Sequence, residues 1–180
     1  VISYDWASLT GNDADAVSFH YFDRENERTE SAYVYAGAKA AAEMYQLLGN
    51  DAKEQELSDL ASKIKNGVLN LLWDNQDKMF RQKDLSTGTL IPWKDSNNYY
   101  PYTEGIAPNT EEYKEGLRYY ADKTQFPVFP FYTANQADKG AATKAGKPGS
   151  NNFSNINSTV TMRLFGKAIR EYPSQYITPE

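Results

Sequence analysis

The sequence predicts a mainly α-helical single domain in which helices pair as αα-hairpins, with one small β-hairpin among them. Residues 30–48 are rich in alanine and end at Gly49, which is typical of a helix with a glycine stop. Residues 51–73 repeat apolar side chains at helical spacing after a short link, so the two helices form a hairpin. A chain of 180 residues is long enough to bury one substantial core.

The first predicted hairpin has a distinct face on each helix. On the first helix, the small residues Ala36, Gly37, Ala40 and Ala41 would let a neighbouring backbone approach closely. At the start of the second helix, Asp51 is suited to act as the N-cap. The apolar face of the second helix is predicted to consist of Leu57, Leu60, Ala61, Ile64, Val68, Leu71 and Leu72.

A small β-hairpin is predicted directly after this pair of helices. Residues 74–77 read as a turn, and the stretches 78–84 and 88–95 flank the polar link 85–87 as two short strands would.

The second half of the chain predicts two further helices separated by irregular segments. A third helix is expected near 111–122, and a fourth from about 155 to 171, ended by Pro173. Prolines and aromatic residues predict an extended or irregular segment over 125–140, and glycines and lysines an exposed loop over 141–150. The apolar face of the third helix would carry Tyr113, Leu117 and Tyr120.

Composition excludes several classes of function. The net charge of -5 comes from interspersed acidic and basic residues, which disfavours a nucleic-acid partner. There is no cysteine and one histidine, His20, so thiol chemistry, a zinc site and an imidazole relay are not expected. No apolar stretch approaches a membrane span. Any catalysis would therefore depend on carboxylates, without metal or cofactor. The chain is also rich in aromatic residues, which suit either stacking on sugar rings or packing in a core.

The stretch SLTGNDADAVSF at residues 8–19 places two carboxylates, Asp13 and Asp15, two positions apart beside Asn12. An EF-hand calcium loop is excluded because its glycine and its distal glutamate are missing. Two interpretations stay open for these carboxylates. They either cap a helix that begins near Ala14, or supply half of a catalytic pair.

A second candidate site surrounds Glu104, which stands in a tyrosine-rich loop at 97–109. A carboxylate partly desolvated by aromatic rings can act as an acid or base, or accept hydrogen bonds from sugar hydroxyls. The alternative is a connector in which Glu104 caps a helix or meets a lysine. Arg28 and Glu30 similarly suit a capping cluster at a helix entrance. The amides of Asn135 and Gln136 suit either hydroxyl recognition or a turn.

The order of these elements resembles that of the six-hairpin glycosidases, the (α/α)6-toroid enzymes that include glucosidases, trehalases and debranching enzymes. The resemblance spans nearly the whole chain. Within this clan, the chain looks most like bacterial multidomain glycoside hydrolases of uncertain specificity, such as those of family 142. The segments that carry it are TGNDADAVSF, ERTESAYVYAGAKAAAEMYQLLGN, NLLWDNQDKMF and YYPYTEGIAP.

The resemblance implies a site made of carboxylates and aromatic residues. Relatives carry a Ser-Gly-x-Asp-Asn-Ser-type stretch before such a hairpin, and its aspartate is the general acid. The match to residues 10–15 implies Asp13 in that role, with Asp15 as the alternative because it stands where a small hydroxyl residue is usual. Glu104 is implied as a pocket carboxylate. The implied substrate-binding residues are Trp6, Asn12, Asp15, Arg28, Glu30, Trp93, Tyr99, Tyr102, Glu104, Asn135 and Gln136, with Trp6, Trp93, Tyr99 and Tyr102 as stacking faces.

The resemblance also implies hydrolysis of oligo- or polysaccharide, inverting by clan analogy, in a periplasmic or secreted bacterial protein. An inverting pair of carboxylates stands roughly 6.5–9.5 Å apart. A toroid needs on the order of twelve helices, whereas about four are predicted here. Residues 1–180 are therefore expected to be part of a catalytic domain whose general base lies outside the chain. The isolated segment would be inactive and would associate with the missing part or with itself. The alternative is a non-catalytic helical module that binds glycans or a protein.

Overall fold

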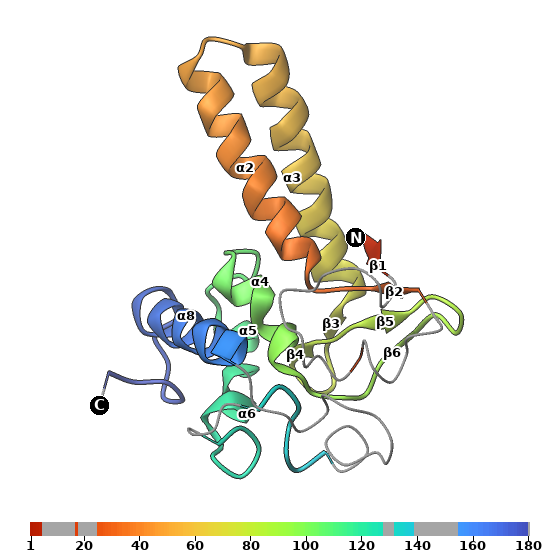
Figure 1. Cartoon of the computed structure of the whole chain (residues 1–180), viewed down its shortest axis with the longest axis vertical. Coiled ribbons are helices and arrows are strands. Elements are labelled where there is room, and N and C mark those ends of the chain that lie inside the picture. The colour runs from red at the N-terminus through yellow and green to blue at the C-terminus, as the bar shows by residue number, and fades with distance from the viewer. Residues whose placement is uncertain (5–16, 18–24, 128–131, 139–154, 180) are drawn as a thin grey trace.

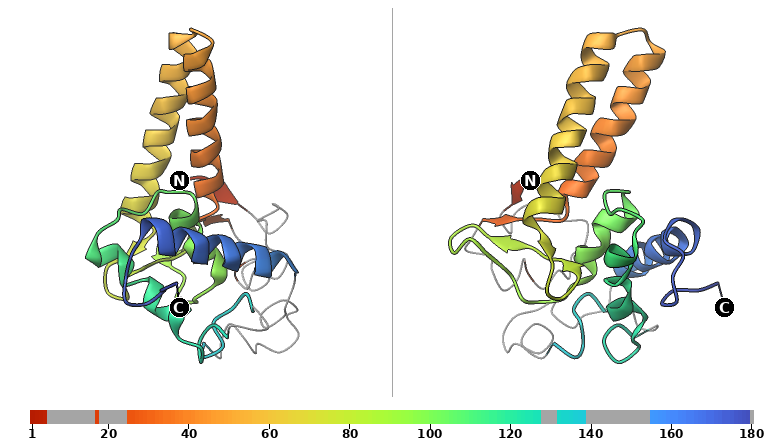
Figure 2. Two further views of the ribbon diagram at one scale, coloured as in Figure 1. Left: turned by 90° about the vertical axis from the view of Figure 1, so that its left-hand side faces the viewer. Right: turned by 180° about the vertical axis from the view of Figure 1, so that it is seen from behind.

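A long helical hairpin stands on a base of short strands and helices in the computed structural model of the chain (Figures 1 and 2). The base carries both described ends of the chain, and the hairpin projects away from it. The mainly α-helical class predicted from the sequence is confirmed, with small antiparallel sheets at one side. The structure describes residues 1–4, 17, 25–127, 132–138 and 155–179.

The projecting hairpin consists of α2 (Ser31–Leu47) and α3 (Asp51–Leu71), which confirms the predicted pair of helices. The turn between them uses Gly49 at φ +69°, a conformation that glycine adopts without strain. The N-cap of α3 is Asn50, whose Oδ1 accepts a hydrogen bond from the Lys53 amide at 3.2 Å. The prediction of Asp51 as the cap was therefore one residue too late, because Asp51 already belongs to the first turn.

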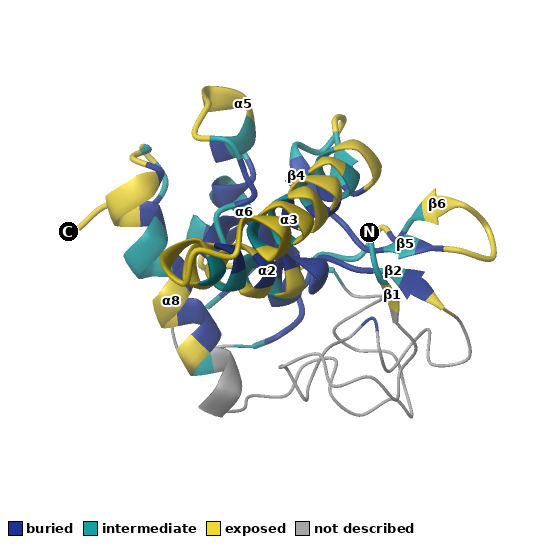
Figure 3. Ribbon diagram, turned by 90° about the horizontal axis from the view of Figure 1, so that it is seen from above, coloured by how far each residue is buried: buried dark blue, intermediate teal, exposed yellow. Residues whose placement is uncertain are grey.

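The two helices contact each other along a narrow strip. Residues Ala61, Ile64 and Val68 of α3 are buried, whereas Leu60 and Leu71 are 42% and 41% exposed. The predicted apolar face of α3 was thus too wide, because among the described elements α3 meets only α2 along most of its length. Figure 3 shows exposed residues over the outward turns of both helices. The predicted close approach to the small residues of α2 is not made at Gly37, which has no described atom within 4 Å of its Cβ position.

Two small antiparallel sheets lie at the foot of the hairpin. The larger has the order β1-β2-β5-β6, and in the smaller β3 pairs with β4. Lys83 pairs with Leu90 across β5 and β6, which confirms the core of the predicted β-hairpin. Its first predicted strand was too long, because Phe80 pairs instead with Trp73. The strands are β1 (Ser3–Tyr4), β2 (Asn26–Glu27), β3 (Trp73–Asp74), β4 (Met79–Phe80), β5 (Lys83–Asp84) and β6 (Thr89–Leu90).

The remaining helices of the base are short, apart from the last. The predicted third helix is broken into α5 (Glu111–Lys114) and α6 (Leu117–Ala121), with Gly116 between them. The predicted fourth helix is confirmed as α8 (Asn155–Glu171), which contacts both of the short helices that follow β6. Those two are the 3-10 helix η1 (Ser96–Tyr99) and α4 (Tyr100–Thr103).

The core of the base is largely aromatic. The ring of Tyr99 packs edge-on against Tyr120 at a centroid separation of 4.8 Å, and Tyr120 stacks on Phe126 at 4.5 Å. The buried hydroxyls of Tyr99 and Tyr102 each have a carbonyl acceptor, so these two rings add apolar contact without leaving a hydroxyl unpaired. Tyr99 donates to the carbonyl of Gly116 at 3.1 Å, and Tyr102 to that of Tyr113 at 2.5 Å.

Candidate functional site

Five polar side chains gather where the chain enters α2. We call them the polar cluster: Arg28, Thr29, Glu30, Gln82 and Asn97. All are 3% exposed or less, although two of the five, Arg28 and Glu30, are residue types that are rarely buried without a partner. They come from the segment before α2, the segment between β4 and β5, and η1, so the cluster joins three parts of the chain at the foot of the hairpin.

Thr29 and Gln82 form the centre of the polar cluster. The backbone amide of Thr29 donates to Gln82 Oε1 at 2.8 Å, and Gln82 Nε2 donates to Thr29 Oγ1 at 2.9 Å. The Thr29 hydroxyl in turn donates to the carbonyl of Asn97 at 2.8 Å. These bonds satisfy both ends of the Gln82 amide and fix the approach of the chain to α2.

The carboxylate of Glu30 is held between an amide and a guanidinium. Its Oε1 accepts a hydrogen bond from Asn97 Nδ2 at 2.9 Å and lies 3.5 Å from Arg28 Nη1. Because both charges are buried, removing one of them would take the opposite charge away from the other, and breaking a buried pair in this way costs several kcal/mol (~3–5). Arg28 and Glu30, predicted as substrate contacts or caps, are therefore inward-facing members of a buried ion pair.

The residues Ala134 and Asn135 are linked to the polar cluster through Asp95. The side chain of Asp95 caps η1 by accepting from the Asn97 amide at 3.0 Å, and Asp95 forms a β-bridge with Ala134. Asn135 is 1% exposed, and its Nδ2 donates to Gln125 Oε1 at 2.7 Å. Gln136 is half-buried and donates to the carbonyl of Ala134 at 2.8 Å. Both predicted amides thus make local structural bonds.

Glu104 lies at the C-terminal end of α4 and connects it to α8. Its side chain is 10% exposed, and its Oε1 accepts from Arg163 Nη2 at 2.6 Å and from Thr103 Oγ1 at 3.2 Å. The predicted partner, a lysine, is thus an arginine from a helix 59 positions further along the chain. The ion pair orients the carboxylate and leaves it as a hydrogen-bond acceptor.

Tyr33, on the first turn of α2, is close enough to both Glu30 and Glu104 for their charges to act on its phenol. Its ring packs on Tyr100 at a centroid separation of 4.7 Å. Burial raises the pKa of the Tyr33 phenol, while the hydrogen bond with Tyr100 and the charge of Arg163 oppose the shift. Glu104 and Glu30 both raise that pKa further through their negative charges. The two carboxylates therefore act on the same phenol, which keeps its proton at neutral pH.

The predicted stacking residues divide into three groups. Tyr99 and Tyr102 are each 1% exposed and pack on other core rings, so burial corrects their predicted role as sugar-stacking faces. Trp93 is half-buried, and its carbonyl lies 3.4 Å from Asn98 Nδ2. The other predicted site residues lie outside the described part of the chain, namely Trp6, Asn12, Asp13 and Asp15.

Sequence reasoning missed three members of the polar cluster: Thr29, Gln82 and Asn97. Gln82 and Arg81 are adjacent in a short extended segment and are both buried, which contradicts the alternation expected of a half-exposed strand. The available signal was the run Ser96-Asn97-Asn98 ahead of the tyrosines, since consecutive small polar residues before a helix often form buried caps.

No three acidic, histidine or cysteine side chains in the described ranges stand close enough to hold a metal ion. Of the helices that the structure describes, none is long and apolar enough to cross a membrane.

Comparison with known proteins places these features in a family. The model of the mannosylglycerate hydrolase MGH1-like glycoside hydrolase domain matches residues 3–140, a range that contains the polar cluster, Glu104 and Asp13. A solved structure named "Sialidase" has a TM-score of 0.77 and 19% identity over 86% of this chain, which shows similarity of fold alone. This chain spans 14% of that protein. Because the family match covers more than half of the sequence, the chain belongs to the MGH1-like glycoside hydrolase family.

Proposed function

We propose that this chain is part of the catalytic domain of a glycoside hydrolase that cleaves O-glycosidic bonds of an oligo- or polysaccharide with inversion. The observation that carries the proposal is the family match over residues 3–140. In the same proposal, α2 and α3 are one hairpin of an (α/α)6 toroid. Their outward faces would then pack against further hairpins of the domain or against a second copy of the chain.

Asp13 is the proposed general acid, with Asp15 as the alternative. The acid protonates the leaving oxygen while a base activates water on the opposite face of the sugar, about 6.5–9.5 Å away. A second carboxylate near Asp13 would raise its pKa and keep it protonated at neutral pH. Asp15 and Glu104 are the candidates for that second charge. The general base is expected from a part of the catalytic domain outside this chain.

The polar cluster has a positioning role in this proposal. Arg28 and Glu30 form their pair almost fully buried, and the hydrogen bonds of Thr29 and Gln82 fix the chain directly before α2. We propose that this rigidity supports the site from within the protein. The proposed substrate contacts are then Trp6, Asn12, Asp15, Trp93, Glu104 and Gln136.

The experiment compares hydrolysis by the longest natural protein that contains this sequence with its Asp13→Asn and Asp15→Asn variants. The substrates are a panel of glycosides that carry either a good aryl leaving group or a poor alkyl one. We expect Asp13→Asn to lower kcat/KM by about 10²–10⁴-fold on alkyl glycosides, because these need protonation of the leaving oxygen. The loss should be smaller on aryl glycosides, and Asp15→Asn should have the weaker effect.

Three outcomes would contradict the proposal. If Asp13→Asn lowered the rate equally for both leaving groups, its role as the acid would be lost. If NMR of the first-formed sugar showed the anomer of the substrate, inversion would be wrong. Saturable glycan binding without turnover in the parent protein would indicate the alternative function, a non-catalytic binding module.

A further inference from the structure

One face of α8 lines an open groove whose lining residues are not among the proposed substrate contacts. The groove has a volume of about 570 Å³, within the range of small-ligand sites. The α8 residues recur at helical spacing along one side of the helix, opposite the buried Leu164 and Ala168. We call this the α8 groove, and it is lined by Thr103, Ser158, Thr159, Met162, Arg163, Gly166, Lys167 and Arg170.

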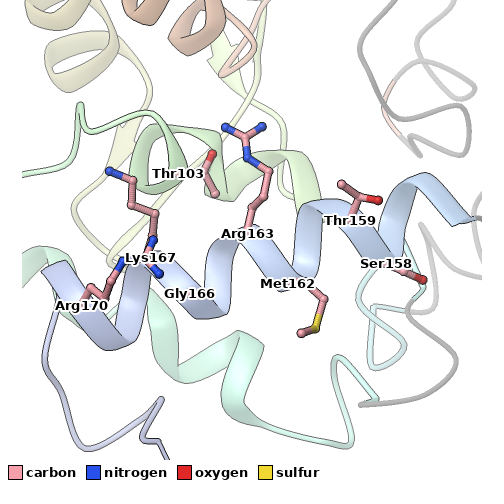
Figure 4. Close-up of a pocket in the computed structure, with 8 residues that line it drawn as sticks. All are labelled: Thr103, Ser158, Thr159, Met162, Arg163, Gly166, Lys167 and Arg170. Carbon is pink, nitrogen blue, oxygen red and sulfur yellow. The ribbon is translucent and has the colours of Figure 1, made fainter.

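The α8 groove is cationic in a chain whose net charge is -5. Arg163, Lys167 and Arg170 contribute three positive charges within two turns of helix. Arg163 is paired with Glu104 and Lys167 with Glu171, each at 2.6 Å. None of the described residues forms an ion pair with Arg170. Figure 4 shows Arg163 and Lys167 extending from α8 on the side of Thr103, with the guanidinium of Arg170 beside Gly166.

Gly166 leaves the space that Arg170 occupies. A Cβ at position 166 would stand 3.1 Å from Arg170 Nη1, so any side chain there would displace the guanidinium by a few tenths of an ångström. Glycine inside a helix costs about 0.5–1 kcal/mol relative to alanine. The guanidinium of Arg170 therefore lies back along α8 and lines the groove. The glycine at position 166 that makes room for it lowers the stability of the helix.

The groups around the α8 groove match an acidic sugar. A guanidinium presents a planar fork of donors that fits the two oxygens of a carboxylate. Lys167 adds a second charge, because a pair as exposed as Lys167–Glu171 is worth only about 0–1 kcal/mol and can be exchanged. The hydroxyls of Thr103 and Ser158 can bond sugar hydroxyls, and Met162 offers an apolar surface.

We propose that the α8 groove binds a carboxylate-bearing saccharide, with Arg170 and Lys167 on the carboxylate and the hydroxyl side chains on the ring. This site is separate from the polar cluster. Its α8 residues also lie beyond residues 3–140, the part of the chain that the family match covers. The inference therefore does not depend on the role of Asp13, and it requires binding alone.

The test is calorimetric titration of the longest natural protein that contains this sequence with digalacturonic acid and with the neutral disaccharide digalactose. The acidic sugar should bind saturably, and more weakly as ionic strength rises from about 0.02 to about 0.3 M. The double variant Lys167→Gln/Arg170→Gln should bind at least about tenfold more weakly, because charge-assisted hydrogen bonds are lost. Lys63→Gln, an exposed lysine on α3, is the matched control and should bind as the parent does.

The proposal is overturned if digalacturonic acid does not bind, if digalactose binds equally well, or if the double variant binds unchanged. Thermal melting checks that each variant is folded. Should the double variant fail to fold, Arg170→Gln alone serves, because its side chain is exposed. Loss of hydrolysis in Asp13→Asn with binding retained would separate this site from the proposed reaction, since the titration needs no turnover.

Discussion

At the scale of single residues, Gln82 shows how one buried amide fixes the start of a long helix. Its Oε1 accepts from the backbone amide of Thr29, two positions before α2 begins, and its Nε2 donates to the hydroxyl of the same residue. Gln82 is 1% exposed, so water does not replace these bonds when the side chain is changed. Loss of the Gln82 side-chain amide is therefore expected to lower the stability of the folded protein more than its small size suggests.

We expect Gln82→Leu to destabilise the protein by about 1–3 kcal/mol, because it leaves the buried amide of Thr29 without an acceptor. Urea unfolding followed by circular dichroism measures the change. The matched control is Gln55→Leu, which removes an exposed bond to Asp59 and should change stability by at most about 0.5 kcal/mol. Equal effects of the two variants would contradict the structural role of Gln82.

A second residue prediction concerns the pH dependence of stability. Tyr172 is 3% exposed and donates to the carbonyl of Ala107 at 2.9 Å. Burial raises the pKa of its phenol from the ordinary value near 10 to about 12. The proton is therefore held more tightly in the folded state, so stability from this group is full below pH 10 and declines as the pH rises toward 12.

Replacement by Tyr172→Phe should flatten this decline. At neutral pH the variant loses the bond to Ala107 and should be less stable by about 1 kcal/mol. Between pH 10 and 12 the gap between variant and parent should narrow, as measured by urea unfolding at several pH values. Tyr45→Phe, on the half-exposed surface of α2, is the control that should run parallel to the parent. A parallel curve for Tyr172→Phe would refute the prediction.

At the scale of secondary-structure elements, two glycines have different surroundings: Gly116 is tightly packed, whereas Gly37 has open space around it. Gly116 separates α5 from α6, and a Cβ there would stand 2.5 Å from the Tyr102 hydroxyl and 2.9 Å from the carbonyl oxygen of Lys78. Gly37 lies inside α2 with no described atom within 4 Å of its Cβ position. One glycine is thus required by close packing, whereas the other only reduces helix stability.

The two glycines should respond to alanine with opposite signs. Gly116→Ala should destabilise by about 1–3 kcal/mol, since the backbone of Lys78 does not yield and moving Tyr102 breaks its bond to Tyr113. Gly37→Ala should stabilise by about 0.5–1 kcal/mol through helix propensity. Thermal unfolding of both variants beside the parent checks the pair. A stabilised Gly116→Ala variant would show that the close contact is not rigid.

The sequence predicted elements where the signal is local and failed where it depends on packing. The pairing of α2 with α3 and the bounds of α8 follow from spacing and glycine stops, which adjacent residues determine. The break at Gly116 depends on Tyr102, which lies 14 positions earlier, and periodicity does not report such a contact. The width of the buried face of α3 likewise depends on which helices stand beside it.

At the scale of the whole molecule, the candidate site was predictable in part. Glu104 was singled out from the sequence as a pocket carboxylate, but its partner Arg163 comes from α8 and was not foreseen. Tyr99 and Tyr102 have the composition of a sugar-stacking surface and instead form the core, because amphipathic rings suit both roles. The polar cluster joins residues 53 and 68 positions apart, so sequence distance concealed it.

The projecting hairpin has a consequence for how the chain tolerates change in length. The 21 residues of α3 carry the Gly49–Asn50 turn about 30 Å from the foot of the hairpin. That turn has an exposed surface, and no described side chain packs on Gly49. Extra residues inserted there would extend into solvent and leave the polar cluster and the α8 groove as they are. The tip is therefore the natural attachment point for a reporter or an added domain.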